Sequence, residues 1–115
     1  MARTTVAASD WLDPAELYVR LDGQIVGTGA ALIALGNLRS GIWQAGNGVY
    51  PSLAFVWTGQ VNLTELGMAA STCNNWTSSA STGMAGFSST TQAPVWWYTT
   101  NSTCDHGYRV YCVEQ

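Results

Sequence analysis

Alternating hydrophobic and polar positions predict the first element of the chain. Every second position from Leu17 to Leu21 is apolar within the segment 16–22, which matches the period of a strand. Asp22-Gly23 follows, and this pair readily adopts the positive φ angles of a tight turn. The pattern therefore predicts a β-hairpin that returns through residues 24–26.

A short apolar run follows the hairpin. Residues 30–35 are alanine, leucine and isoleucine, and Gly36-Asn37 can adopt the left-handed conformation that ends a helix. We therefore expect one or two helical turns between Gly29 and Gly36. The run is far shorter than the roughly 20 residues that a helix needs to cross a bilayer, so no membrane span is expected.

The rest of the chain has the pattern of short strands between long loops. Strands are predicted where aromatic and β-branched residues cluster, and loops where glycine, serine and threonine dominate. The expected strands are 53–57, 72–77, 95–98 and 108–113, and the expected loops and connections are 40–50, 60–72, 78–94 and 99–107. Residues 1–15 are interpreted as a polar lead, either a linker or an opening strand. The fold class expected for the single domain 16–115 is α+β and mostly β.

Aromatic residues supply both core and ligand-binding candidates. Trp57 and Trp76 are expected in the core. Strand alternation would place Trp96 and Tyr98 on one side and Trp97 on the other, so at least one of them is expected to be buried. Aromatic rings can also stack on sugars or anchor a protein partner. The candidate ligand-binding residues are Trp43, Trp96, Trp97, Tyr98 and Asn101.

Charge excludes one class of partner. Only 10% of the residues are charged, there is no lysine, and the net charge is −3. The four arginines are scattered along the chain, so they cannot neutralise a run of phosphates. Nucleic acid is therefore not an expected partner.

The sequence offers little catalytic chemistry. Cys104-Asp105-His106 contains a nucleophile, an acid and a base, but sequence neighbours rarely converge on one substrate atom. His106, which precedes Gly107, is expected to be a surface turn residue. The chain has no paired carboxylates, phosphate-binding glycine loop or Cys-x-x-Cys motif. An enzyme is therefore not expected, and one that uses His106 is only a remote alternative.

Three cysteines bear on the cellular compartment. Cys73, Cys104 and Cys112 lie in polar, tryptophan-rich segments and lack metal-ligand spacing. This arrangement favours a disulfide framework, typical of an oxidising compartment, over a zinc site. The alternative of three reduced, buried cysteines in a cytosolic protein stays open. With an odd count, at least one thiol has no partner within the chain.

Four motifs of the C-terminal half occur in a recognisable order. They are Val56-Trp57-Thr58-Gly59, Cys73-Asn74-Asn75-Trp76, Cys104, and the terminus Tyr108-Arg109-Val110-Tyr111-Cys112-Val113-Glu114-Gln115. This order resembles the C-terminal half of endostatin, the collagen-derived C-type-lectin-like domain, and even more closely bacterial endostatin-like surface proteins. The likeness extends upstream to residues 18–23, so that it covers about residues 16–115.

The resemblance implies a cysteine pairing. It pairs Cys73 with Cys104, and closing this loop would stabilise the fold by roughly 3 to 4 kcal/mol. Cys112 matches a cysteine whose partner lies on an N-terminal helix of the family. The family's N-terminal strand and helices should precede Glu16, where this chain has only the polar lead. Either the chain is truncated, or a partner chain supplies the missing surface and a thiol for Cys112, so a homo-oligomer is one expectation.

Metal sites of the family do not carry over. The carboxylate and amide motifs that bind calcium in many C-type lectins are missing here. Endostatin's zinc site uses histidines near its N-terminus, whereas this chain has only His106. We therefore expect no metal and no cofactor.

Together, these features predict a secreted or cell-surface recognition module that is not catalytic. Its ligand is expected to be a protein or a glycan, bound by the loops 41–50 and 78–107, since binding residues concentrate on loops carried by a rigid scaffold. The alternative is a structural subunit of a self-associating surface assembly.

Overall fold

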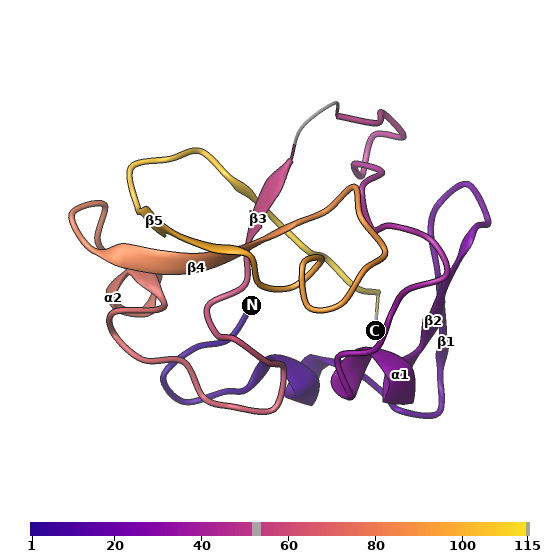
Figure 1. Ribbon diagram of the computed structural model, residues 1–115, viewed down its shortest axis with the longest axis horizontal. Coiled ribbons are helices and arrows are strands. Elements are labelled where there is room, and N and C mark those ends of the chain that lie inside the picture. The colour runs from indigo at the N-terminus through magenta and orange to yellow at the C-terminus, as the bar shows by residue number, and fades with distance from the viewer. Residues whose placement is uncertain (52–53, 115) are drawn as a thin grey trace.

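The computed structural model describes residues 1–51 and 54–114 and shows a small α+β protein (Figure 1). Its described part contains two sheets, one with the strand order β1-β2 and the other with the order β5-β4-β3-β6. The elements are a 3-10 turn at Ala8–Trp11, β1 Leu17–Val19, β2 Ile25–Thr28, α1 Gly29–Ile33, β3 Phe55–Trp57, α2 Cys73–Trp76, β4 Thr82–Phe87, β5 Thr100–Thr103 and β6 Arg109–Val110. The mixed α+β class expected from the sequence is therefore observed.

The predicted hairpin is confirmed as the antiparallel pair β1–β2. Gly23 adopts a φ of 84° in its turn, a conformation that costs glycine little. On β1, Leu17 and Val19 are exposed, whereas Tyr18 between them packs against the core. The apolar side of the alternation therefore faces outward from this hairpin.

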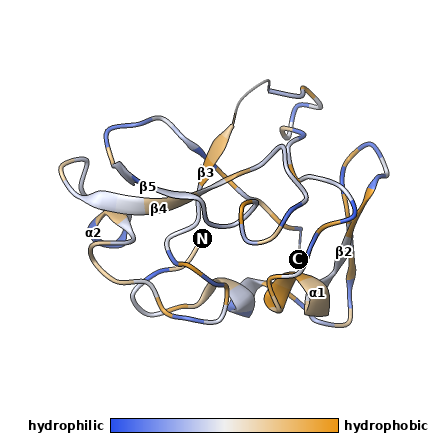
Figure 2. Ribbon diagram, viewed as in Figure 1, coloured by the Kyte–Doolittle hydropathy of each residue, from blue (hydrophilic) through white to orange (hydrophobic). Residues whose placement is uncertain are grey.

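The predicted short helix is confirmed as α1, which follows β2 directly. The Thr28 hydroxyl caps its start by accepting a hydrogen bond from the Ala31 amide at 3.2 Å. The helix ends earlier than expected, because Leu35 already takes the left-handed conformation with a φ of 56°. Figure 2 shows α1 and β3 in orange, the colour of hydrophobic residues, whereas β4 is nearly white.

The strand predicted at 53–57 is present as β3, and Leu53 lies outside the described residues. β3 pairs antiparallel with β4 and parallel with β6. β6 is much shorter than the strand expected over 108–113, since only Arg109 and Val110 pair with β3. Gln115, the last residue of the C-terminal motif, also lies outside the described residues.

Two loop predictions are wrong because small residues form strands there. β4 occupies 82–87 inside the segment expected to be a surface loop, and β5 lies in the expected turn region 99–107. The two strands pair antiparallel. A Cβ built on Gly86 of β4 would lie 2.5 Å from the Trp97 carbonyl oxygen, so this strand needs a residue without a side chain to pack closely.

Two strand predictions are also wrong. Residues 95–97 form turns, and the amides of Trp97 and Tyr98 donate to the Pro94 carbonyl. Residues 73–76 form the short turn α2, in which all four residues have positive φ angles. Both segments lie where the chain must reverse direction, which propensity alone does not reveal.

Among the residues that the structure describes, the core has two clusters of buried residues. The larger cluster contains Ala2, Ala8, Val26, Leu32, Leu38, Leu63, Trp96 and Trp97, and the smaller contains Trp57, Cys73 and Ala85. Trp57 is therefore a core residue as expected, and the partly buried Trp76 packs against the same cluster. Figure 1 shows the hairpin and α1 at one end of the molecule and β4 and β5 at the other.

Residues 1–15 pack into this body instead of extending from it. Ala2 is fully buried, and its amide donates to the Thr58 carbonyl at 2.8 Å. The Trp76 indole donates to the Ala2 carbonyl at 2.8 Å. The segment interpreted as a polar lead therefore contributes small side chains and backbone hydrogen bonds to the core.

Candidate functional site

The loop 41–50 is attached to the β1–β2 hairpin by a polar network. Arg20 donates through two guanidinium nitrogens to the two oxygens of Asp22, at 3.1 and 2.7 Å. A third nitrogen of Arg20 donates to the Gly41 carbonyl at 3.1 Å. From the loop, Gln44 accepts a hydrogen bond from the Asp22 amide at 3.0 Å. Paired charge-assisted hydrogen bonds of this kind hold a defined geometry.

Tyr50 closes this network at the far end of the loop. Its hydroxyl donates to Asp22 Oδ2, and the Arg20 guanidinium lies 5.7 Å from the centre of its ring. The Trp43 ring lies 5.0 Å from that of Tyr50 at an angle of 54°. Tyr50 nevertheless remains 41% exposed. The loop therefore presents an aromatic surface whose position is set by the hairpin.

The network also fixes the charges of the site. Hydrogen bonds from Arg20 and then Tyr50 hold the pKa of Asp22 well below its usual range. The same hydrogen bond to Asp22 raises the pKa of the Tyr50 phenol. Asp22 is therefore a carboxylate and Tyr50 a neutral phenol near neutral pH. The site offers an aromatic face beside carboxylate and amide groups, a combination that suits a sugar or a protein side chain.

The structure places the other candidate ligand-binding residues elsewhere. Trp96 and Trp97 are only 1% and 4% exposed, and the Trp96 indole donates to the Gly36 carbonyl at 2.9 Å. Both are core side chains, because the turn at 95–97 directs the two neighbouring rings inward together. This corrects the expectation that they offer a ligand-binding surface.

Tyr98 and Asn101 are also separate from the loop 41–50, which carries Trp43 and Tyr50 and is called the aromatic loop below. Tyr98 is partly buried against the larger core cluster, and Asn101 is exposed on β5, where it pairs with Met84. Figure 1 shows β5 on the left of the molecule, whereas the loop 41–50 lies to the right of β3. Of the five candidates, only Trp43 belongs to the site at the hairpin. Tyr50 and Asp22 were missed because only the folded chain brings them together.

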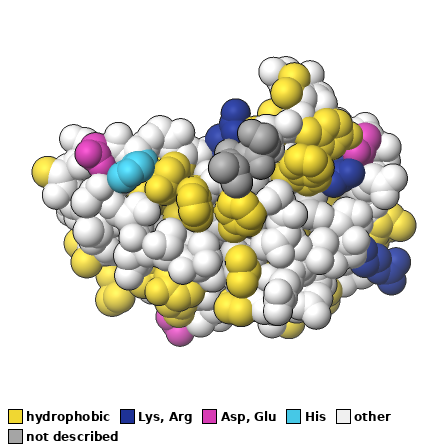
Figure 3. Space-filling view, turned by 45° about the horizontal axis from the view of Figure 1, so that its top comes forward, with side chains coloured by type: hydrophobic (Ala, Val, Ile, Leu, Met, Phe, Trp, Pro, Cys, Tyr) yellow, Lys and Arg dark blue, Asp and Glu magenta, His cyan; other side chains and the backbone are white. Residues whose placement is uncertain are grey.

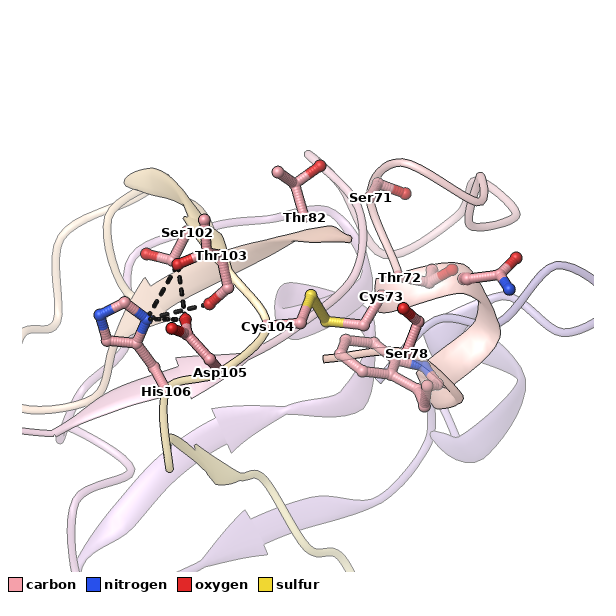
Figure 4. The surroundings of a disulfide bond; sticks show 12 residues. Ser71, Thr72, Cys73, Ser78, Thr82, Ser102, Thr103, Cys104, Asp105 and His106 are labelled. Carbon is pink, nitrogen blue, oxygen red and sulfur yellow. Dashed lines mark hydrogen bonds and ion pairs between the residues drawn. A yellow bond between two sulfur atoms is a disulfide. The ribbon is translucent and has the colours of Figure 1, made fainter. Parts of the chain in front are cut away.

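A disulfide joins α2 to the end of β5 (Figure 4). It connects Cys73 and Cys104, whose Cα atoms lie 5.8 Å apart. This is the pairing that the endostatin resemblance implies. Among the described residues the remaining free cysteine is Cys112, which is exposed.

His106 lies in the turn that follows this disulfide (Figure 4). Its Nδ1 atom is 2.9 Å from the Thr103 carbonyl oxygen and 3.2 Å from Asp105 Oδ1. The Thr103 hydroxyl donates to the same Asp105 oxygen at 2.6 Å. Because Cys104 is held in the disulfide, Cys104-Asp105-His106 does not contain a free thiol.

A row of aromatic rings crosses the four-stranded sheet beside His106. Ring centres are 5.4 Å apart for Phe87–Phe55, 5.2 Å for Phe55–Tyr108 and 5.0 Å for Tyr108–His106. Figure 3 shows hydrophobic side chains running across this face from beside the histidine. The row was missed because Phe55 and Phe87 become neighbours only through the unpredicted strand β4.

Within 1–51 and 54–114, no group of three or more histidine, cysteine, aspartate and glutamate side chains could hold a metal ion. None of the helices in this part of the chain has the length and apolar composition needed to span a bilayer.

No family model, curated protein or solved structure matches this chain. The described residues form a disulfide-containing α+β structure with two sheets. The C-type-lectin-like and endostatin-like assignment stays a prediction from the sequence motifs.

Proposed function

We propose that this protein is a recognition module of the C-type-lectin-like class, close to the endostatin branch, that binds a protein or glycan ligand without catalysis. The observation that carries the proposal is the link between Tyr50 and Asp22, which holds an exposed aromatic ring on a fixed loop. A pre-positioned ring loses little conformational entropy on binding. Exposed tyrosine and tryptophan side chains are also frequent anchors of binding surfaces.

The disulfide supports two further parts of the proposal, the location of the protein and the lack of catalysis. The Cys73–Cys104 disulfide suits a secreted or cell-surface location, since such bonds persist in oxidising compartments. The same disulfide includes Cys104, the cysteine two residues before His106. The motif Cys104-Asp105-His106 therefore lacks the free thiol that a nucleophile would need.

The experiment is to screen the purified chain against arrays of glycans and extracellular proteins, and then to compare variants on each hit. Tyr50→Ala should weaken binding by about tenfold or more, because an aromatic anchor is lost. Tyr50→Phe retains the ring and should cause a smaller loss. Met68→Ala serves as the control, since Met68 is 57% exposed and lies beside α2, where its carbonyl accepts a hydrogen bond from the Thr72 amide. Hits that bind wild type, Tyr50→Ala and Met68→Ala equally, or a complete absence of hits, would contradict the proposal.

A further inference from the structure

A groove of about 1330 Å³ separates the hairpin from the C-terminal segment. Two runs of six consecutive residues, 16–21 and 109–114, line it. Six extended residues span about 20 Å. Strands β1 and β6 form part of these two walls, so each wall can lie beside a short extended segment of polypeptide.

The groove is lined by apolar side chains that the fold leaves uncovered. On the hairpin side, Leu17, Val19 and Leu21 are 51%, 55% and 72% exposed. On the opposite side, Val110 and Val113 are 43% and 38% exposed. A contiguous exposed surface of this kind marks an interaction site more often than scattered single residues do.

The sheet edges beside the groove are also open. Among the described residues, β1 pairs only with β2, and β6 pairs only with β3. Each strand therefore keeps one edge whose backbone groups can pair with an added strand. Addition of an extended peptide to an open sheet edge is a common mode of recognition.

Charges on the groove favour a basic occupant. Its lining includes four carboxylates, those of Asp10, Asp13, Glu16 and Glu114. The two arginines of the lining are Arg20 and Arg109. Arg20 already forms an ion pair with Asp22, with 2.7 Å between its guanidinium nitrogen and the carboxylate oxygen. A second copy of this chain carries a net charge of −3 and would bring the same carboxylates into the groove, which disfavours it electrostatically.

We propose that the groove binds an extended peptide segment of a partner protein, with apolar side chains at alternate positions and basic residues at its ends. This inference rests on the proposed recognition function and specifies the ligand as protein. Trp43 connects the two surfaces, because it lines the groove and also contacts Tyr50. The apolar face of the peptide would cover Val19 and its neighbours, while its basic ends would meet the carboxylates.

The probe is a fluorescently labelled peptide of alternating valine and threonine between two lysine pairs, titrated with the full chain. We expect saturable binding that weakens as salt is added, because opposite charges attract less at higher ionic strength. A matched peptide with glutamate in place of each lysine should bind at least about tenfold more weakly. Equal binding of the two peptides, or no binding of the lysine peptide, would overturn the proposal.

Two pairs of variants locate the binding. Val19→Gln should weaken the lysine peptide about fivefold, whereas Leu66→Gln should not, since Leu66 is 52% exposed but does not line the groove. Glu16→Gln should weaken it, whereas Glu65→Gln, outside the groove, should not. Equal changes in peptide affinity within either pair would show that the peptide binds elsewhere and would contradict the proposal.

Two other outcomes are distinguished by the same samples. Light scattering could show a dimer that is lost in both Val19→Gln and Cys112→Ser. This result would mean that a second copy occupies the groove, and it would overturn the peptide proposal. Loss of peptide binding alone, with array hits that still depend on Tyr50, would overturn this inference and leave the proposed function standing.

Discussion

The Tyr50 hydroxyl donates a hydrogen bond to the Asp22 carboxylate across 28 residues of sequence. This contact joins the end of the aromatic loop to the turn of the hairpin. Arg20 donates to the same carboxylate and to the loop backbone at Gly41. The loop therefore depends on a carboxylate that belongs to another element, and its order should respond to the ionisation of that carboxylate.

Replacing Tyr50 with phenylalanine should raise the pKa of Asp22 toward its ordinary value. Arg20, the larger cause of the lowered pKa, remains in this variant, so the pKa should stay below the usual range of about 4. Carboxyl chemical shifts followed by NMR during a pH titration would measure the change. Asp105, in the turn beside the disulfide, is the internal control, and an unchanged Asp22 titration would contradict the hydrogen bond.

The same carboxylate makes stability depend on pH in a defined direction. A lowered pKa in the folded state favours the ionised form, so the stabilisation is present above the ordinary pKa of aspartate and is lost as the pH falls below it. Urea midpoints measured between neutral pH and about pH 3 should therefore decline less steeply for Tyr50→Phe than for wild type. Parallel declines would show that Tyr50 does not contribute to the shift.

Removing the disulfide should destabilise the fold substantially. Cys73 and Cys104 are separated by 31 residues, and the loss of a loop of this length corresponds to about 3 to 4 kcal/mol in the free energy of unfolding. Urea unfolding of a Cys73→Ser, Cys104→Ser double variant would measure the loss. Cys112→Ser is the matched control, because its thiol is exposed and free. Equal stability of the double variant and the control would contradict a structural role for the disulfide.

Gly86→Ala should reduce stability because β4 packs closely against the turn at 95–97. A Cβ at this position would lie 2.5 Å from the Trp97 carbonyl oxygen and 2.6 Å from that of Trp96. Backbone must move to relieve such contacts, at a cost of about 1 to 3 kcal/mol or more. In thermal unfolding, Gly46→Ala should behave like wild type, since a Cβ there meets nothing within 4 Å. Similar melting temperatures for the two variants would contradict the close packing of β4 against the turn.

Tyr111→Phe should alter the response to alkaline pH. Burial raises the pKa of the Tyr111 phenol well above its ordinary value of about 10, so the protonated form is favoured in the folded protein. Stability is therefore fully present below pH 10 and lost as the pH rises above it. The variant should lose about 1 kcal/mol at neutral pH, because the Trp96 carbonyl loses its 2.6 Å hydrogen bond. As the pH rises further, the free energy of unfolding measured in urea should fall less for the variant than for wild type. A parallel fall would contradict the raised pKa of Tyr111.

Sequence reasoning succeeded where neighbouring residues decide the structure. Asp22-Gly23 predicts the hairpin because its turn needs a positive φ angle, which Gly23 adopts. The apolar run before Gly36 predicts α1, although Leu35 ends the helix sooner. In the candidate site, the same reasoning identified Trp43 from its glycine-rich loop but could not supply Asp22 or Tyr50.

The sequence by itself determined the α+β class, the hairpin, the short helix and, through the family resemblance, the cysteine pair. Tertiary structure alone decided that β4 and β5 are strands, that Trp96 and Trp97 turn inward, and that the apolar side of β1 lines a groove. Turn and helix signals act between residues a few positions apart. Burial and strand pairing depend on segments far apart in the chain, whose contacts local propensity does not encode.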